Sequence, residues 1–201
     1  MKQTICLFGD SITWGAWDRE RGGWAARLRS YLETNNRDVA VYNCGVSGDT
    51  VADLLQRFDV ECKARGPNII VLSIGINDSR YYTTKDKPET TPEQFQKNFD
   101  ELLKKAKKYA DAIICLGLTK VDEKITTPCS WKPDKYYDDE NIRKYDAIMQ
   151  KSCDHAGVLF HSLYDLLDFS DLVDGLHPSS KGHEKMFLAI KDFFQKQGYI
   201  S

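Results

Sequence analysis

The stretch IIVLSIGIND, residues 69–78, contains the pattern on which the expected fold depends. Its first four residues are all apolar, without the alternation of a strand that has one face in water. Such runs are typical of a parallel strand that is covered by helices on both faces. Glycine, asparagine and aspartate follow at residues 75, 77 and 78, so the stretch predicts a buried strand that ends in a polar loop.

The same arrangement recurs along the chain. Short apolar runs predict further strands at 4–8, 39–42, 112–118 and 158–160, beside the one at 69–74. Helical patterns lie between these runs, at about 23–34, 50–62, 91–109 and 138–156, and a last one begins near Ser179 or Ser180. Strands that alternate with helices in this way predict a central parallel sheet of about five strands with helices on both faces.

Length and composition are those of an ordinary globular protein. The 201 residues fit one domain, expected over 1–201, and the chain is 29% charged and 41% hydrophobic. A net charge of -2 gives no general attraction to nucleic acid or to an anionic membrane. The expected partner is therefore a small molecule, with no nucleic acid and no membrane insertion, while the sequence leaves the oligomeric state open.

The sequence also carries an expectation about the compartment. The first apolar run is too short for the core of a signal peptide, and no later run has the length of a membrane-spanning helix. The cysteines contain no C-x-x-C pair and are expected to be reduced thiols. We therefore expect a cytoplasmic protein with free thiols at Cys6, Cys44, Cys62, Cys115, Cys129 and Cys153.

Polar, glycine-containing segments follow several of the expected strands. In a parallel sheet such segments gather at the carboxyl edge, where ligands bind. This placement predicts one shared site built from Gly9-Asp10-Ser11, residues 45–49, Gly75-Ile76-Asn77-Asp78 and residues 174–178.

The chemistry of these segments is complementary. A serine hydroxyl such as that of Ser11 becomes a nucleophile when a base removes its proton. Asp174 and His177 are three residues apart, so the carboxylate can orient one imidazole nitrogen while the other faces Ser11. The Asn77 amide, a loop glycine and the Ser11 N–H can stabilise a tetrahedral oxyanion. Asp10 is expected to organise its loop by hydrogen bonding.

These four segments are also where the sequence resembles a known family, the SGNH (GDSL-type) hydrolases. The family's blocks stand here, in the family's order, as Gly9-Asp10-Ser11, Gly48, Gly75-Ile76-Asn77-Asp78 and Asp174-Gly175-Leu176-His177. The resemblance implies a three-layer α/β/α, flavodoxin-like fold in which the serine strand lies between the glycine and asparagine strands. It also implies Ser11 as nucleophile, His177 as base, Asp174 as its orienting group, and Gly48 and Asn77 as oxyanion donors.

Two points within the site remain open in the sequence. Gly45 also lies in the second block, although Gly48 fits better because the family's glycine typically precedes Asp or Asn, as Gly48 precedes Asp49. His161 follows the fifth strand and is a rival base, but no carboxylate lies at matching spacing.

The expected reaction is hydrolysis of a carboxylic ester of a small alcohol, sugar or lipid through an acyl-serine intermediate, with no cofactor or metal. The same family also includes thioesterases and lysophospholipases as alternatives. A flavin- or phosphate-binding module is an alternative of another class, but neither a P-loop lysine nor a G-x-G-x-x-G motif is present. Two long connections, 79–91 and 119–139, should overhang the site and carry Tyr81, Tyr82, Trp131, Tyr136 and Tyr137.

Overall fold

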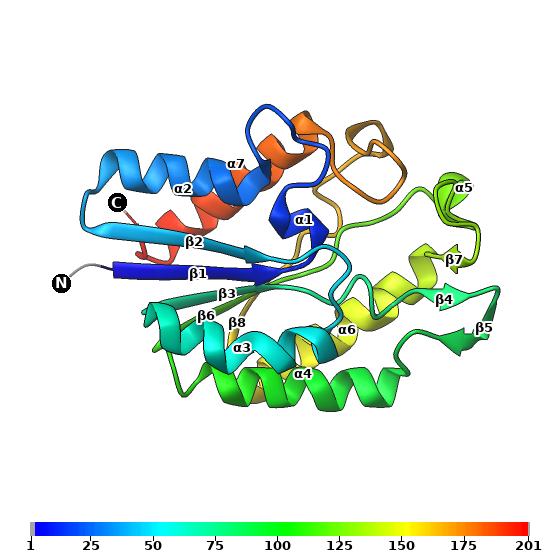
Figure 1. Ribbon diagram of the computed structural model, residues 1–201, viewed down its shortest axis with the longest axis horizontal. Helices are drawn as coiled ribbons and strands as arrows, with labels where there is room; N and C mark the ends of the chain where they lie inside the picture. Colours follow the sequence, from blue (N-terminus) through cyan, green and yellow to red (C-terminus); the bar gives the residue numbers. More distant parts are fainter. Residues whose placement is uncertain (1–2, 201) are drawn as a thin grey trace.

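The computed structural model, which describes residues 3–200, has a central sheet of five parallel strands (Figure 1). The strand order is β2-β1-β3-β6-β8. The β1 strand, with the serine loop at its end, therefore lies between β2 and β3, as the resemblance implied. The strands are β1 (Gln3–Gly9), β2 (Val39–Gly45), β3 (Ile69–Ser73), β6 (Ala112–Leu116) and β8 (Leu159–His161).

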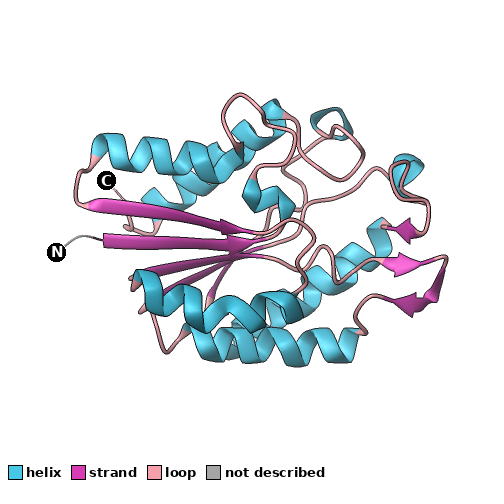
Figure 2. Cartoon of the chain, viewed as in Figure 1, coloured by secondary structure: helices cyan, strands magenta, loops and turns pink. Residues whose placement is uncertain are grey.

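Helices cover both faces of this sheet and complete the expected three-layer α/β/α fold (Figures 1 and 2). One layer contains α2 (Gly23–Asn35) and α7 (Ser180–Lys196), which pack against each other. The other contains α3 (Val51–Arg65), α4 (Pro92–Ala106) and α6 (Asp139–Ala156). Within residues 3–200, none of the helices combines the length and the apolar character that a bilayer crossing requires.

The core forms because the central strands are apolar on both sides. Ile70, Val71 and Leu72 are completely buried, as the run without alternation predicted. The ring of Phe8 on β1 packs 4.8 Å from that of Phe58 on α3, measured between centroids. Full burial of each such side chain contributes about 1.5–3 kcal/mol to the free energy of unfolding. Apolar contacts on both faces of the sheet therefore hold both helical layers against it.

The helix boundaries follow local side-chain chemistry. The α3 helix begins with a capping box, in which Thr50 accepts from the Asp53 N–H and the Asp53 carboxylate accepts from the Thr50 N–H. It ends at Gly66, whose φ of 60° is a left-handed conformation that suits glycine. The capping box fixes where the loop after β2 turns into α3, and Gly66 fixes where the helix ends.

The two long connections contain more regular structure than the sequence analysis expected. They form a small antiparallel sheet of order β5-β4-β7, from β4 (Tyr81–Tyr82), β5 (Thr84–Pro88) and β7 (Lys135–Tyr136). Short helices were missed as well, namely α1 (Ser11–Trp14), α5 (Glu123–Thr126) and the 3-10 turn η1 (Phe169–Asp171). Strands of two residues show no periodicity, and their pairing depends on contacts such as the Tyr81–Tyr136 stack.

A buried carboxyl group ties the loop after β3 to the helical layer below it. Asp78 is fully buried and accepts hydrogen bonds from the Val51 N–H and the Thr90 hydroxyl, each of 3.0 Å. Burial raises the pKa of Asp78 to about 7, although both hydrogen bonds act in the opposite direction. The folded protein therefore holds the Asp78 proton more tightly than the unfolded chain does.

This difference in proton affinity predicts a pH dependence of stability. The favourable contribution of protonated Asp78 is complete below its ordinary pKa of 3.8 and is lost as the pH rises to about 7. Asp78→Asn keeps an oxygen for Val51 and Thr90 but does not titrate. Relative to wild type, the variant should therefore gain stability between pH 4 and 7, measured by urea unfolding at several pH values. A constant difference across this window would contradict the account.

Candidate active site

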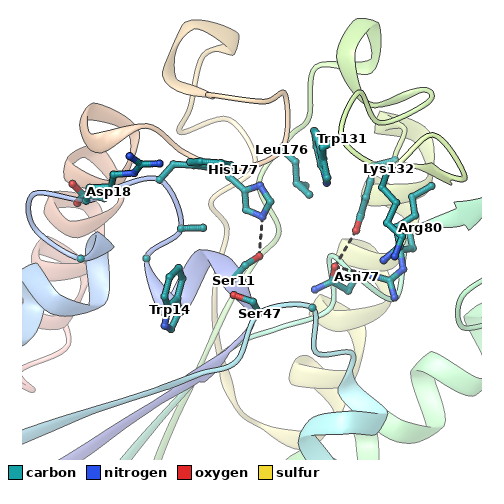
Figure 3. Close-up of a pocket in the computed structure, with 18 residues that line it drawn as sticks. Ser11, Trp14, Asp18, Ser47, Asn77, Arg80, Trp131, Lys132, Leu176 and His177 are labelled. Atoms are coloured by element: carbon teal, nitrogen blue, oxygen red, sulfur yellow. Dashed lines mark hydrogen bonds between the residues drawn. The ribbon is translucent and has the colours of Figure 1, made fainter.

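The four predicted segments meet around one cleft of about 730 Å³ at the carboxyl edge of the sheet (Figure 3). Ser11 from the loop after β1, Gly48 after β2, Asn77 after β3 and His177 before α7 all line it. Asp174 lies behind His177, on the side of the imidazole away from Ser11. The structure thus brings together every residue of the predicted site.

The position of Ser11 follows from a tight turn at the end of β1. Asp10 is the N-cap of α1, and its carboxylate accepts from the Ile12 N–H at 2.9 Å. A Cβ at Gly9 would lie 2.1 Å from the Thr13 hydroxyl oxygen and 2.4 Å from the Ser73 carbonyl oxygen, so the turn needs glycine there. Asp10 is nearly fully buried, which raises its pKa to about 6. As expected, it organises the loop.

A continuous line of hydrogen bonds joins Ser11, His177 and Asp174. Ser11 Oγ lies 2.9 Å from His177 Nε2, and His177 Nδ1 lies 2.8 Å from Asp174 Oδ2. An ionised carboxylate can only accept, so Nδ1 carries the hydrogen and the lone pair of Nε2 faces the Ser11 hydroxyl. This is the geometry in which an imidazole can remove a serine proton.

The surroundings of Asp174 keep it ionised. Burial alone would raise its pKa, but the hydrogen bond to the His177 ring and those from the His177 and Leu176 N–H groups outweigh burial. The pKa of Asp174 is therefore below its ordinary value.

Trp17 is a further partner of Asp174 that the sequence analysis missed. Its indole N–H donates to Asp174 Oδ2 at 2.8 Å, the same oxygen that accepts from His177. The backbone of Trp17 has a φ of 67°, which is uncommon for a residue with a side chain. Nothing in the sequence marks this contact, because it joins residues that are 157 positions apart.

The Asn77 side chain is held in one orientation by its neighbours. Its carbonyl oxygen accepts from the Arg80 guanidinium at 3.1 Å and from the Tyr137 hydroxyl at 2.9 Å. Its amide nitrogen donates to the Asp49 carbonyl oxygen at 3.0 Å and is turned toward the cleft (Figure 3). From the sequence, Tyr137 was expected only as an aromatic residue of a long connection, and no sequence pattern marks Arg80.

The geometry distinguishes the two glycines of the second block. The Gly45 N–H donates to Asn43 Oδ1 at 2.9 Å, and a Cβ at Gly45 would lie 2.4 Å from the Trp14 nitrogen. Its amide is thus engaged within the loop. Gly48 lines the cleft, with open space around it and a φ of 90°. These positions favour Gly48 as the glycine that faces a ligand.

Two of the other three histidines, His161 and His183, lie in buried or partly buried environments outside the site. His161, the rival base, stacks on Phe193 with centroids 4.3 Å apart, and burial lowers its pKa. His183 is buried and bridges the Trp24 N–H and the Ala16 carbonyl oxygen, so it packs α7 against the loop after α1. Neither lines the cleft. Residues 3–200 hold no group of three His, Cys, Asp or Glu side chains arranged for a metal ion.

Comparison with known proteins gives a consistent result. The model of the GDSL-like Lipase/Acylhydrolase family matches residues 7–185. The chain is 29% identical over 116 residues to Esterase TesA of Pseudomonas aeruginosa, a match that covers 58% of this chain and 54% of that protein. The alignment thus spans about half the length of this curated relative.

Two solved structures have the same fold. One is LAE5, an alpha/beta hydrolase enzyme from the metagenome of Lake Arreo, with a TM-score of 0.74 at 22% sequence identity. The match covers 98% of this chain and 95% of the LAE5 chain. The other is Axe2, an acetylxylan esterase from Geobacillus stearothermophilus, with a TM-score of 0.73 at 21% sequence identity. This match covers 96% of this chain and 95% of the Axe2 chain. At this level of identity, the similarity concerns the fold.

The hydrogen-bonded serine predicts a selective chemical reactivity. A fluorophosphonate should react with the Ser11 hydroxyl, forming a P–O bond and releasing fluoride, because His177 can take the proton. Intact-mass and peptide mass spectrometry should find one adduct, on the peptide that contains Ser11. Ser11→Ala should stay unlabelled, while Ser47→Ala, which removes a second hydroxyl from the cleft wall, should be labelled normally. Labelling of Ser11→Ala to the same extent would contradict this interpretation.

Proposed function

We propose that this chain, which belongs to the GDSL-like lipase/acylhydrolase family, hydrolyses carboxylic esters through an acyl intermediate on Ser11. The observation that carries the proposal is the hydrogen-bonded line from Ser11 through His177 to Asp174, placed in a cleft opposite the Asn77 amide. The segments that supply these groups are far apart in the sequence, and the fold brings them together.

In the first half-reaction, Ser11 Oγ attacks the ester carbonyl carbon while its proton moves to His177 Nε2. Asp174 stabilises the imidazolium that forms, because its carboxylate already accepts from Nδ1. Nε2 then returns the proton to the departing alkoxide as the carbon–oxygen bond breaks. The products are an alcohol and acyl-Ser11.

In the second half-reaction, water replaces the alcohol. His177 removes a proton from the water as it attacks the acyl carbon, and then gives the proton to Ser11 Oγ. The carboxylic acid leaves and the resting state is restored.

Each half-reaction passes through a tetrahedral oxyanion that needs hydrogen-bond donors. We assign this role to the N–H groups of Ser11 and Gly48 and to the side-chain amide of Asn77. Arg80 and Tyr137 hold the Asn77 oxygen, which directs its nitrogen into the cleft before substrate arrives. Donors that are already oriented need no reorganisation during the reaction.

The proposed compartment is the cytoplasm, and the thiols support it. All six cysteines are free and buried in the structure. A chain with several unpaired cysteines fits a reducing environment better than an oxidising one.

The role of Asp174 can be tested by Asp174→Asn. An amide at this position can donate to Nδ1 and so favour the tautomer with hydrogen on Nε2, which cannot accept the Ser11 proton. We expect kcat for 4-nitrophenyl acetate to fall by about 10⁴ with little change in KM. Asp165→Asn, in an exposed position before η1, is the matched control and should keep full activity. Equal kcat values for the two variants would remove Asp174 from the mechanism.

The role of Asn77 can be tested by comparing Asn77→Ala with Asn77→Asp. Aspartate keeps an acceptor for Arg80 and Tyr137 but replaces the proposed donor by a negative charge. Loss of one oxyanion donor should lower kcat by about 10²–10³, with KM little changed, and Asn77→Asp should be at least as impaired as Asn77→Ala. If Asn77 serves only to shape its loop, aspartate should restore most of the activity that alanine loses. Melting curves should confirm that both variants are folded.

A further inference from the structure

The wall of the cleft is positively charged, whereas the chain as a whole has a net charge of -2. The sequence has 28 basic and 30 acidic residues, but among residues 3–200 the cleft is lined by four cationic side chains and one acidic side chain, with His177 set aside. The acidic one is Asp18, and the cationic ones are Arg19, Arg80, Lys132 and Lys135.

The one acidic side chain is already neutralised. Asp18 is buried, pairs with the Arg27 guanidinium and accepts from the Gly23 N–H at 3.0 Å. Its carboxylate is therefore committed to the structure of the loop between α1 and α2. The charge that the cleft offers to a ligand is positive.

Two of the cations, Lys132 and Lys135, come from a single ordered turn. The Lys135 N–H donates to the Lys132 carbonyl oxygen at 2.9 Å, and the Cys129 N–H donates to the Lys135 carbonyl oxygen at 2.8 Å. This turn leads into β7 and from there to Tyr137, which holds Asn77. Lys132 lies on the side of the cleft that also carries Arg80 (Figure 3), and Lys135 lines the same cleft.

These lysines lack the partners that surface lysines often have. Across residues 3–200, neither Lys132 nor Lys135 forms an ion pair, whereas Arg80 pairs with Glu89 at 2.7 Å. Glu89 also accepts from the Tyr82 hydroxyl at 2.5 Å, so its carboxylate is occupied. Burial and the charges of Arg80 and Lys132 lower the pKa of Lys135, and the nearby carboxylates of Glu89 and Asp134 oppose this only in part. Lys132 and Lys135 thus lie near each other and near Arg80 beside the cleft, and within the described residues neither ammonium group is engaged in an ion pair.

We propose that the cleft selects esters that carry a second, anionic group, a carboxylate or a phosphate, which Lys132 and Lys135 bind. This inference rests on the proposed ester hydrolysis and specifies its substrate class. Trp131, which adjoins Lys132, packs with its ring 6.0 Å from that of His177 and lines the same wall.

Binding to the Ser11→Ala variant tests the inference without turnover. Two pairs of esters are compared, in each of which a methyl group replaces the anionic group: 4-nitrophenyl hydrogen adipate against 4-nitrophenyl hexanoate, and 2-acetoxyethyl phosphate against 2-methoxyethyl acetate. A charge-assisted contact should make the Kd of the anionic member at least about tenfold lower in one pair. The pair that shows the difference identifies the anion as a carboxylate or a phosphate.

The lysines are tested in the same background. Lys132→Met together with Lys135→Met should reduce the preference to less than about twofold, whereas Lys124→Met should keep it. Lys124 is an exposed lysine of the neighbouring α5 that does not line the cleft, so it controls for the general charge of this region. Equal Kd values within both pairs would overturn the inference, and so would a preference that survives in the double variant.

The outcome is separate from that of the proposed function. Turnover of the neutral esters by the wild-type protein tests ester hydrolysis, and the Kd ratios test the cationic wall. A protein that hydrolyses both members of each pair equally, with equal Kd values, would keep the proposed function and lose the proposed substrate class.

Discussion

The hydrogen bond from His177 Nδ1 to Asp174 Oδ2 is the interaction on which the proposed chemistry depends. It determines which imidazole nitrogen carries hydrogen, and so whether the other can accept the Ser11 proton. Hydrogen bonds from the His177 ring and from two backbone N–H groups lower the pKa of this carboxylate, which also accepts from the Trp17 indole. A loop of a few residues before α7 thus contains both the base and the group that orients it.

The rest of the fold places partners around this pair. Parallel strands bring the loops after β1, β2 and β3 to one edge, and buried carboxyl groups then fix those loops. Asp10 caps the helix that begins at Ser11, and Asp78 joins the loop of Asn77 to the start of α3. Burial raises the pKa of both Asp10 and Asp78, so the folded state becomes less stable as the pH rises and these carboxyl groups ionise. The two buried carboxyl groups that fix these loops therefore lower the free energy of unfolding in neutral solution.

The sequence was informative where the pattern is local. Short apolar runs located the five strands of the sheet, and glycine, asparagine and serine at the ends of strands located the candidate site. It was uninformative where contacts are distant. Trp17 meets Asp174, and Arg80 and Tyr137 hold Asn77, through pairings that no short motif encodes. The antiparallel β5-β4-β7 sheet was missed because two of its strands have two residues each.

The central claim is that Ser11 carries the acyl group during turnover, and trapping that species tests it most directly. Wild-type protein mixed with excess 4-nitrophenyl acetate is quenched in acid within the first turnovers, and its peptides are analysed by mass spectrometry. The account predicts one acetyl group on the peptide that contains Ser11, formed together with a burst of 4-nitrophenolate and lost as turnover ends. Steady hydrolysis without a burst or an acetylated Ser11 peptide, and undiminished in Ser11→Ala, would contradict it.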